Sequence, residues 1–547
     1  MLLEKLMANV GRSNYPQYAK EDRGARGFVR RTPEFERIKN LPRRKWEDEN
    51  LSPRESRDGK MSLWPAQAAA LYECGLFGGA FCPIGVGQGK ALISLLAPVI
   101  MQALRPVLFV PAQLREQTLT HVIPEMKKHW RLHPGLRVIG YSELSLEKNK
   151  DMLVTLNPDL IILDECHMAK NRSAGRTRRL VRWFREHPET KCVAMSGTIS
   201  KRSLKDFAHI IDWCLGPLAP LPRRWPELQE WALAIDEGIE DEARYAPGVL
   251  GEFCNTGENV RQGYCRRLTE TPGVIATKES AVDASIQITR FPGLAIPEPV
   301  GRVMDHVRRS WETPDGDPIL QAVDLWRHMR ELALGFWYRW EPAPPKRWLD
   351  ARRVWKQYVR EVLKHNRRGL DTELQVWKDC DDLPERRAWD EVKDEYHINT
   401  VPEWISDFAL RAVDRWSQEG GIIWVEHTAV GEALHGRGLS YFGAGDDAIL
   451  MTTAPAIVAS IGAHSTGKNL QRYSRNLVVS PMTSGLTWEQ MMGRTHRAGQ
   501  LADTVTFDVF LHCEELEASF ERARSDARYQ EETFGNRQKL NFADIAI

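Results

Sequence analysis

Short apolar segments alternate with longer helical segments in two separate blocks of the sequence, and this alternation limits the folds that the chain can adopt. In the first block, Leu63 to about Leu215, the expected buried strands are Ala80–Ile84, Val107–Val110, Val138–Tyr141, Leu160–Leu163 and Val193–Met195. Between them, Lys90–Leu104 and Gly175–Glu186 are expected as helices. Strands that alternate with helices form a parallel sheet with helices on both faces.

The second block starts near Trp404 and repeats this pattern. We expect a helix at Trp404–Gln418 and strands at Ile422–Val425, Ile457–Ile461, Asn476–Ser480 and Val505–Phe510. The sequence therefore predicts an α/β protein with two parallel-sheet domains and a helical insert between them. The expected boundaries are 1–60 for a basic N-terminal arm, 61–216 for the first domain, 217–400 for a linker and the insert, and 401–547 for the second domain.

Bulk composition limits the class of protein. The chain has 547 residues, 42% hydrophobic and 27% charged, values typical of a soluble globular protein with several domains. A net charge of +1 argues against a globally basic, histone-like protein, so any nucleic-acid surface must be a local patch. The nine cysteines show no close spacing of a zinc ligand set, and their odd number argues against a disulfide framework. A reducing, cytoplasmic compartment is therefore expected. We expect no signal peptide and no membrane segment, because the longest apolar stretch, Ala91–Leu104, is too short to cross a bilayer.

A glycine-rich segment follows the first expected strand and begins the helix after it. It contains Gly85, Val86, Gly87, Gln88, Gly89, Lys90 and Ala91. Glycines in this context let backbone N–H groups surround a phosphate at a helix N-terminus, and Lys90 would reach the outer phosphates of a nucleotide. The alternative is a tight turn in an unrelated α/β fold. Ile84 and Ala91 depart from the strict phosphate-loop pattern, which has a small residue and a hydroxyl residue at these positions.

Two carboxylates follow the apolar run Leu160–Leu163, namely Asp164 and Glu165. They are expected at the carboxyl edge of the sheet, where ligands bind parallel α/β folds. One carboxylate can hold Mg²⁺ through water and the other can orient or deprotonate an attacking water. The alternative is a pair of strand-end acids that cap the next helix.

The strand Val193–Met195 ends similarly in Ser196, Gly197 and Thr198, a weak signal when taken alone.

The segment from Gln490 to Gln500 carries the most specific pattern. On a helix, Gln490, Arg494 and Arg497 would share one face. Guanidinium groups held in this way can stabilise charge on a transferring phosphoryl group. The alternative is a solvated basic helix face.

With these motifs in this order, the sequence resembles the superfamily-two helicases, and within them the SWI/SNF-type ATPases, including the compact versions carried by bacteriophages. The resemblance covers residues 63–215 and 404–512. In the first block it rests on Leu63-Trp64-Pro65-Ala66-Gln67, Val110-Pro111-Ala112, Gly140-Tyr141-Ser142-Glu143-Leu144, Asp164-Glu165-Cys166-His167 and Ser196-Gly197-Thr198. In the second it rests on His464-Ser465-Thr466-Gly467-Lys468-Asn469-Leu470-Gln471 and His496-Arg497-Ala498-Gly499-Gln500. The latter favours the SWI/SNF branch over the DEAD-box RNA branch.

The resemblance implies two RecA-like domains that hydrolyse ATP with Mg²⁺ while moving along nucleic acid, with DNA favoured over RNA. It assigns nucleotide contacts to Gln67, Gly85, Gly87, Gln88, Gly89, Lys90 and Ala91, and the metal to Asp164. It assigns catalysis to Lys90, Asp164, Glu165, Gln490, Arg494 and Arg497, and coupling to His167, Ser196, Thr198, Gly467 and Asn469. It also implies the cytoplasm of a bacterium or of a phage-infected host. Protein partners are not indicated.

Two alternatives stay open. Because Ala91 lacks the hydroxyl that normally binds Mg²⁺, the chain could be a nucleotide-gated clamp that hydrolyses ATP only weakly. It could also be an RNA-remodelling helicase. A DNA translocase or helicase is the leading hypothesis.

The tryptophan-rich segment 217–400 contains a basic stripe. Arg352, Lys356, Arg360 and Lys364 recur every fourth residue, and Trp348, Trp355, Val359 and Val362 form an apolar face of the same helix. The stripe could bind nucleic-acid phosphates, or it could be the solvated side of a structural helix whose tryptophans are core. Stacking of the tryptophans on exposed bases is a third possibility.

The basic N-terminal arm likewise could be a surface arm or a nucleic-acid contact.

Overall fold

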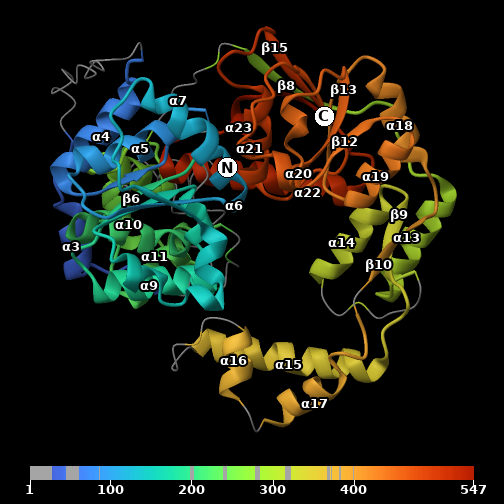
Figure 1. Cartoon of the computed structure of the whole chain (residues 1–547), viewed down its shortest axis with the longest axis horizontal. Helices are drawn as coiled ribbons and strands as arrows, with labels where there is room; N and C mark the ends of the chain where they lie inside the picture. The colour runs from blue at the N-terminus through green and yellow to red at the C-terminus, as the bar shows by residue number, and fades with distance from the viewer. Residues whose placement is uncertain are drawn as a thin grey trace, which may run out of the picture. The chain divides into compact units, whose positions relative to one another are not determined.

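The computed structural model divides the chain into two compact units. The first comprises 1–280 and 526–538, and the second comprises 281–525 and 539–547. The structure describes residues 27–44, 61–85, 87–197, 203–237, 239, 243–276, 282, 284–314, 319, 322–365, 370, 373–380, 383–397 and 399–547. Each unit contains one large parallel sheet, so the α/β class expected from the sequence is confirmed (Figure 1).

The sheet of the first unit has five parallel strands. They are β2 (Ala80–Cys82), β3 (Pro106–Val110), β4 (Arg137–Gly140), β5 (Leu160–Asp164) and β6 (Lys191–Met195). All five expected strands are present within a few residues of their expected bounds. Their spatial order is β2-β6-β5-β3-β4, so that β6, the last strand along the chain, lies between β2 and β5.

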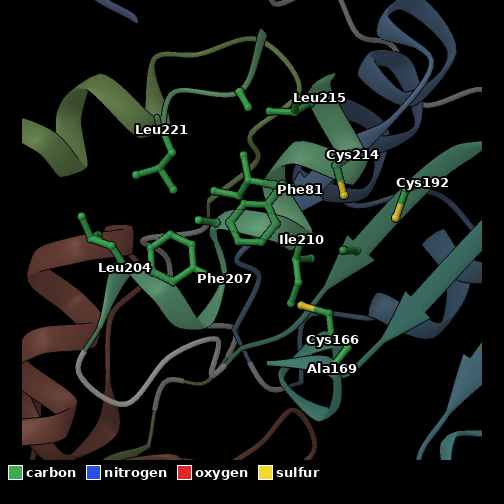
Figure 2. Close-up of a cluster of buried hydrophobic side chains, with 14 of the residues drawn as sticks. Phe81, Cys166, Ala169, Cys192, Leu204, Phe207, Ile210, Cys214, Leu215 and Leu221 are labelled. Atoms are coloured by element: carbon green, nitrogen blue, oxygen red, sulfur yellow. The ribbon is translucent and has the colours of Figure 1, made fainter. Parts of the chain in front are cut away.

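Both faces of this sheet are buried, as the continuous apolar runs predict. Side chains along β5 alternate between two cores: Ile161 and Leu163 belong to one, and Leu160 and Ile162 to the other. The second of these cores also contains residues of α4 (Pro65–Phe77) and α5 (Lys90–Ile100), whereas the first contains residues of α9 (Gly175–Glu186) and α10 (Ala208–Leu215). Figure 2 shows part of the first core, where the rings of Phe81 and Phe207 stack with their centres 6.3 Å apart. Shorter helices α6 (Ala112–Gln117), α7 (Ile123–Lys127) and α8 (Met152–Leu156) complete the connections.

The described part of the N-terminal arm is not a separate arm. Residues 27–44 contain β1 (Gly27–Phe28) and α3 (Pro33–Lys39), and α3 buries Phe35 and Ile38 in the first core. Arg44 makes a largely buried ion pair with Glu73, whereas Arg43 pairs with Glu270 at the surface. A helix this short shows too little periodicity to be recognised from the sequence.

The first unit also extends past the boundary expected at residue 216. It includes β7 (Tyr245–Ala246), which pairs with β1, and the helices α11 (Trp225–Ile235) and α12 (Val260–Thr269). Val274 forms a bridge with Phe81 of β2. These residues therefore complete the first core and are not a linker. The end of α22 (Glu514–Phe534) contributes as well, because residues 526–538 belong to the first unit although the helix begins in the second.

The sheet of the second unit has seven parallel strands in the order β12-β13-β11-β14-β15-β8-β16. The bounds are β8 (Ser285–Arg290), β11 (Gly421–Val425), β12 (Ser440–Phe442), β13 (Ala456–Ser460), β14 (Arg475–Val478), β15 (Thr504–Val509) and β16 (Asp544–Ala546). The four expected strands of the second block are present. Strand β8 lies in the segment expected to be linker and insert, and it pairs with β15 and β16. Helices α18 (Phe408–Ser417), α19 (Thr428–Gly436), α20 (Ile461–His464), α21 (Gly485–Thr495) and α23 (Lys539–Phe542) belong to this unit.

Only part of the expected insert forms a subdomain of its own. Helices α13 (Glu298–Ser310) and α14 (Ala322–Leu332) pack on the core of the second sheet. Strands β9 (Phe336–Trp340) and β10 (Thr400–Trp404) form an antiparallel pair. The sequence between them forms the helices α15 (Lys346–His365), α16 (Glu373–Asp379) and α17 (Pro384–Val392). Helix α15 packs against both α16 and α17 (Figure 1). One small core buries Trp355 among residues of all three helices, and a second buries Trp348 between α15 and α17. Both tryptophans are therefore core residues.

No helix in the described part of the chain is both long enough and apolar enough to span a membrane.

A buried ion pair ties the C-terminal residues to α21. Glu489 and Lys539 have side chains only 3% and 9% exposed, and Lys539 Nζ donates to Glu489 Oε1 at 2.6 Å. We predict that Lys539→Met lowers the free energy of unfolding by about 3–5 kcal/mol, because it leaves a buried carboxylate without its counter-charge. Urea denaturation followed by tryptophan fluorescence measures this change.

The matched control is Arg524→Met, which removes a surface pair with Glu521 whose side chains are 39% and 56% exposed. This variant should lose less than about 1 kcal/mol. Equal losses in the two variants would show that the buried pair contributes no more than a surface pair.

Candidate functional site

The glycine-rich loop lies between β2 and α5 and adopts a backbone that only glycine accepts readily. Gly87 and Gly89 have φ values of +90° and +71°. A Cβ atom on Gly89 would lie 2.1 Å from Gln67 Nε2, while one on Gly87 would meet no atom within 4 Å. Gln67 Nε2 donates to Gly89 O at 3.2 Å. The structure thus brings Gln67 to the loop, and Val86 lies outside the described residues.

Lys90 is buried at the start of α5 and faces back into the loop. Its Nζ donates to the carbonyl oxygens of Ile84 at 3.1 Å and Gly85 at 3.2 Å, and it lies 3.8 Å from Glu165 Oε1. Gln88 N donates to Gly85 O at 3.4 Å, which closes the turn. These contacts place the lysine ammonium between the loop and the acidic end of β5.

Ala91 is exposed beside this loop and carries no hydroxyl group. The nearest hydroxyl along the helix is that of Ser94, which donates to Lys90 O at 3.3 Å. Ser94 therefore does not replace the hydroxyl that the phosphate-loop pattern has at position 91.

Asp164 is the last residue of β5, and Glu165 follows it in a left-handed conformation with φ of +53°. Non-glycine residues rarely adopt this conformation, and strained positions of this kind concentrate at functional sites. Glu165 N donates to Asp164 Oδ1 at 3.1 Å.

Glu165 is held by two residues that the sequence suggested only as coupling residues. Ser196 Oγ donates to Glu165 Oε2 at 2.8 Å, and His167 Nδ1 lies 3.0 Å from Ser196 Oγ and 3.3 Å from Glu165 Oε2. Ser196 can reach Glu165 because β6 is the neighbour of β5 in the sheet. Thr198, the other residue expected here, lies outside the described residues.

The two carboxylates differ in their tendency to ionise. Burial, together with the neighbouring charge of Glu165, raises the pKa of Asp164 above its usual range. Burial also opposes the ionisation of Glu165, but Lys90, His167 and Ser196 outweigh it and lower the pKa of Glu165 well below its usual range. Glu165 is therefore held as a charged carboxylate whose oxygens face a cation and a hydroxyl.

Arg494 and Arg497 lie together in the second unit, but Arg497 does not share a helix face with Gln490 and Arg494 as expected, because α21 ends at Thr495. Arg494, on α21, is buried; its Nε donates to Gln490 O at 2.8 Å and its Nη1 to Lys468 O at 3.3 Å. Arg497 is half-buried and donates through Nη1 to Lys468 O at 3.4 Å and to Asn469 Oδ1. The structure thus brings the Gly467–Asn469 segment to the arginines. Burial lowers the pKa of Arg497. The side-chain nitrogen Nε2 of Gln490 is buried and has no hydrogen-bond partner among the described residues.

The described members of the basic stripe interact within their own subdomain. The guanidinium of Arg352 lies 5.4 Å from the ring centre of Trp348, and Lys356 Nζ pairs with Glu373 at 2.5 Å. The side chains of Arg360 and Lys364 lie outside the described residues. These contacts support the interpretation of a structural helix for the described half of the stripe.

Two residues at the candidate site were not singled out from the sequence. Lys468 is buried, pairs with Asp447 and offers its carbonyl to both arginines. It lies inside the motif His464–Gln471, but a buried lysine cannot be recognised from the pattern. Asn536 donates through Nδ2 to Gly197 O at 2.7 Å, and no sequence signal pointed to it.

The chain matches no model of a known protein family. A comparison with curated proteins finds no significant match. Within the described ranges, no group of three or more His, Cys, Asp or Glu side chains could hold a metal ion on its own.

The two arginines should differ in their contribution to stability. We predict that Arg494→Ala lowers the free energy of unfolding by about 1–3 kcal/mol, since it removes a buried donor from Gln490 O and Lys468 O. Arg497→Ala should lower it by less than about 1 kcal/mol, because Arg497 is half-buried and water can replace its hydrogen bonds. Chemical denaturation of both variants measures the difference, and an equally large loss for Arg497→Ala would contradict this assignment.

Proposed function

We propose that the chain is a nucleic-acid-stimulated ATPase that couples ATP hydrolysis to movement along DNA. One observation carries the proposal: side chains from three strand ends converge on Glu165. Lys90 comes from the loop after β2, Glu165 and His167 follow β5, and Ser196 follows β6. A lysine in a glycine-rich loop, a buried charged carboxylate and a hydroxyl at one sheet edge form a suitable arrangement for hydrolysing a phosphoanhydride.

The conformation of the loop supports the proposal that it binds a nucleoside triphosphate. Its two left-handed glycines, and the open space beside Gly87, leave the backbone accessible to a phosphate group at the N-terminus of α5. Lys90 Nζ now donates to loop carbonyls and would turn to the outer phosphates. Gln67, which donates to Gly89 O, would contact the nucleotide beside the loop.

In this proposal Asp164 would hold Mg²⁺ together with phosphate oxygens and waters. Mg²⁺ retains several waters and needs only one or two carboxylates, so the single Asp164 is sufficient. ATP supplies the bond whose hydrolysis provides free energy. Glu165 would orient the attacking water, while Lys90 would stabilise the developing charge. Ser196 and His167 hold the carboxylate of Glu165 in place.

The contribution of the second unit rests on the sequence motif. We propose that Arg494 and Arg497 stabilise charge during hydrolysis and that Gly467 and Asn469, with Thr198, couple hydrolysis to movement. The grouping of Lys468 and Asn469 with the arginines supports this role, because a shift of one segment would move the other. The nucleic-acid partner is proposed to be contacted through phosphates, which makes movement independent of sequence.

A nucleotide-gated clamp is the second candidate. The observation that favours it is Ala91, whose exposed methyl group replaces the usual Mg²⁺ ligand while Ser94 is engaged elsewhere. A clamp would bind ATP and nucleic acid but turn ATP over slowly.

Steady-state ATP turnover with duplex DNA, single-stranded DNA and RNA tests the proposal. We predict stimulation by DNA above the basal rate, and a loss of at least ~100-fold in both Lys90→Ala and Glu165→Gln. Lys90→Ala should also weaken nucleotide binding, because it removes a positive charge from the phosphates. Glu165→Gln should retain nucleotide binding, measured with a fluorescent ATP analogue.

The control is Lys128→Ala, which removes an exposed lysine paired with Glu125 on the surface of the same unit. It should leave turnover within about twofold of the wild type. Turnover within about tenfold of the wild type in either site variant would contradict the assignment, and stimulation by RNA alone would favour an RNA-remodelling enzyme.

We further predict that Ala91→Thr lowers the Mg²⁺ concentration needed for half-maximal turnover, since threonine restores a hydroxyl ligand. Ala91→Val is the matched control, because valine has the size of threonine without the hydroxyl. Mg²⁺ titrations of the three proteins measure the effect. Superimposable titrations of wild type and Ala91→Thr would mean that another group supplies the ligand, and turnover in Ala91→Thr but not in the wild type would favour the clamp.

A further inference from the structure

The segment that ends α22 makes a direct contact beside the catalytic cluster. Asn536 is 1% exposed, and its Nδ2 donates to Gly197 O at 2.7 Å. Gly197 is the residue after Ser196, and Ser196 donates to Glu165. A residue near the end of the chain therefore supports the backbone that carries the hydroxyl partner of the proposed catalytic carboxylate.

The segment has its own anchors in the first unit, so Asn536 is positioned independently of Gly197. Phe534 packs against Phe207 and Phe81, with ring centres 4.6 and 6.4 Å apart; the positions of Phe207 and Phe81 in the core are visible in Figure 2. Tyr529 donates to Asp236 Oδ1 at 3.3 Å, and Glu532 pairs with Arg261 at 3.3 Å. Phe81 belongs to β2, the strand that leads into the glycine-rich loop.

The amide of Asn536 is used as a donor. Its Oδ1 is buried with no hydrogen-bond partner among the described residues, whereas its Nδ2 satisfies Gly197 O. Burying the side-chain carbonyl of Asn536 without a partner is unfavourable. If this side chain only filled space, a small apolar residue would be more favourable here than asparagine. The hydrogen bond to Gly197 O indicates that the side-chain N–H of Asn536 is the group needed at this position.

We propose that Asn536 is a positioning residue for hydrolysis: through Gly197 and Ser196 it holds Glu165 in its catalytic orientation. The proposal rests on the ATPase function proposed above. According to this proposal, the site in the first unit also depends on Asn536. This residue follows the strands β11–β15 of the second unit in the sequence. Misplacement of a catalytic group by about 1 Å commonly lowers a rate by orders of magnitude.

The test compares Asn536→Asp and Asn536→Ala with Glu532→Gln in the full-length protein. Aspartate matches asparagine in shape but cannot donate to Gly197 O when ionised, and alanine removes the amide. Glu532→Gln is the control, because it weakens an anchor of the same segment without touching Gly197. Three quantities are measured: maximal ATP turnover, affinity for a fluorescent ATP analogue, and hydrogen exchange in a peptide that contains Ser196 and Gly197.

We expect both Asn536 variants to lower maximal turnover at least tenfold while the affinity for the ATP analogue stays within about threefold of the wild type. Hydrogen exchange at Ser196 and Gly197 should be faster in both. Glu532→Gln should keep turnover within about twofold. This split between turnover and affinity separates positioning from a general loss of folding, which would reduce both.

Turnover within twofold of the wild type in Asn536→Ala or Asn536→Asp, with an active wild type, would overturn the positioning role and leave the ATPase function intact. An equal loss of turnover in Glu532→Gln would also overturn it, because docking of the segment would then be the cause. A wild type without turnover under any condition would contradict the proposed ATPase function and this inference with it.

Discussion

The pairing of β6 between β2 and β5 is the constraint on which the candidate site depends. Because β6 is the neighbour of β5, Ser196 reaches the carboxylate that follows β5, and because β2 is the other neighbour, Lys90 approaches the same carboxylate from the glycine-rich loop. A buried carboxylate is costly unless it is paired and hydrogen-bonded. Lys90, Ser196 and His167 meet that requirement for Glu165, so the strand order determines both the stability of this charge and its chemistry.

Each unit is assembled from segments that are far apart in the sequence. The core of the first unit contains Phe35 from the N-terminal part and Phe534 from the end of α22, and the sheet of the second unit includes β8 and the C-terminal β16. The ion pair of Lys539 with Glu489 and the hydrogen bond of Asn536 with Gly197 lie only three residues apart in the sequence, yet they belong to different units. Residues after 525 therefore complete both units, although neither unit is continuous in the chain.

Elements with a strong local pattern could be predicted from the sequence. All five strands of the first sheet and four of the second were expected, because continuous apolar runs flanked by turns indicate buried parallel strands. The elements that were missed are short or half-exposed. Strand β8 alternates buried and exposed side chains within a segment that otherwise looks helical, and the three-residue β16 carries too little pattern to recognise. Their place in the sheet comes from non-local pairing with β15 and with each other.

The sequence alone determined which chemical groups are present and at which strand ends they occur: the glycines before Lys90, the Asp164–Glu165 pair, and the arginines at positions 494 and 497. Local order is sufficient for this, because a strand end and the loop after it are adjacent in the chain. The partners of these groups were decided only by the tertiary structure. Glu165 is held by Ser196, Gly197 by Asn536 and Arg494 by Lys468. These hydrogen bonds join residues that are tens to hundreds of positions apart. They depend on which strands become neighbours and on how the ends of the chain pack, and a local sequence pattern does not predict either.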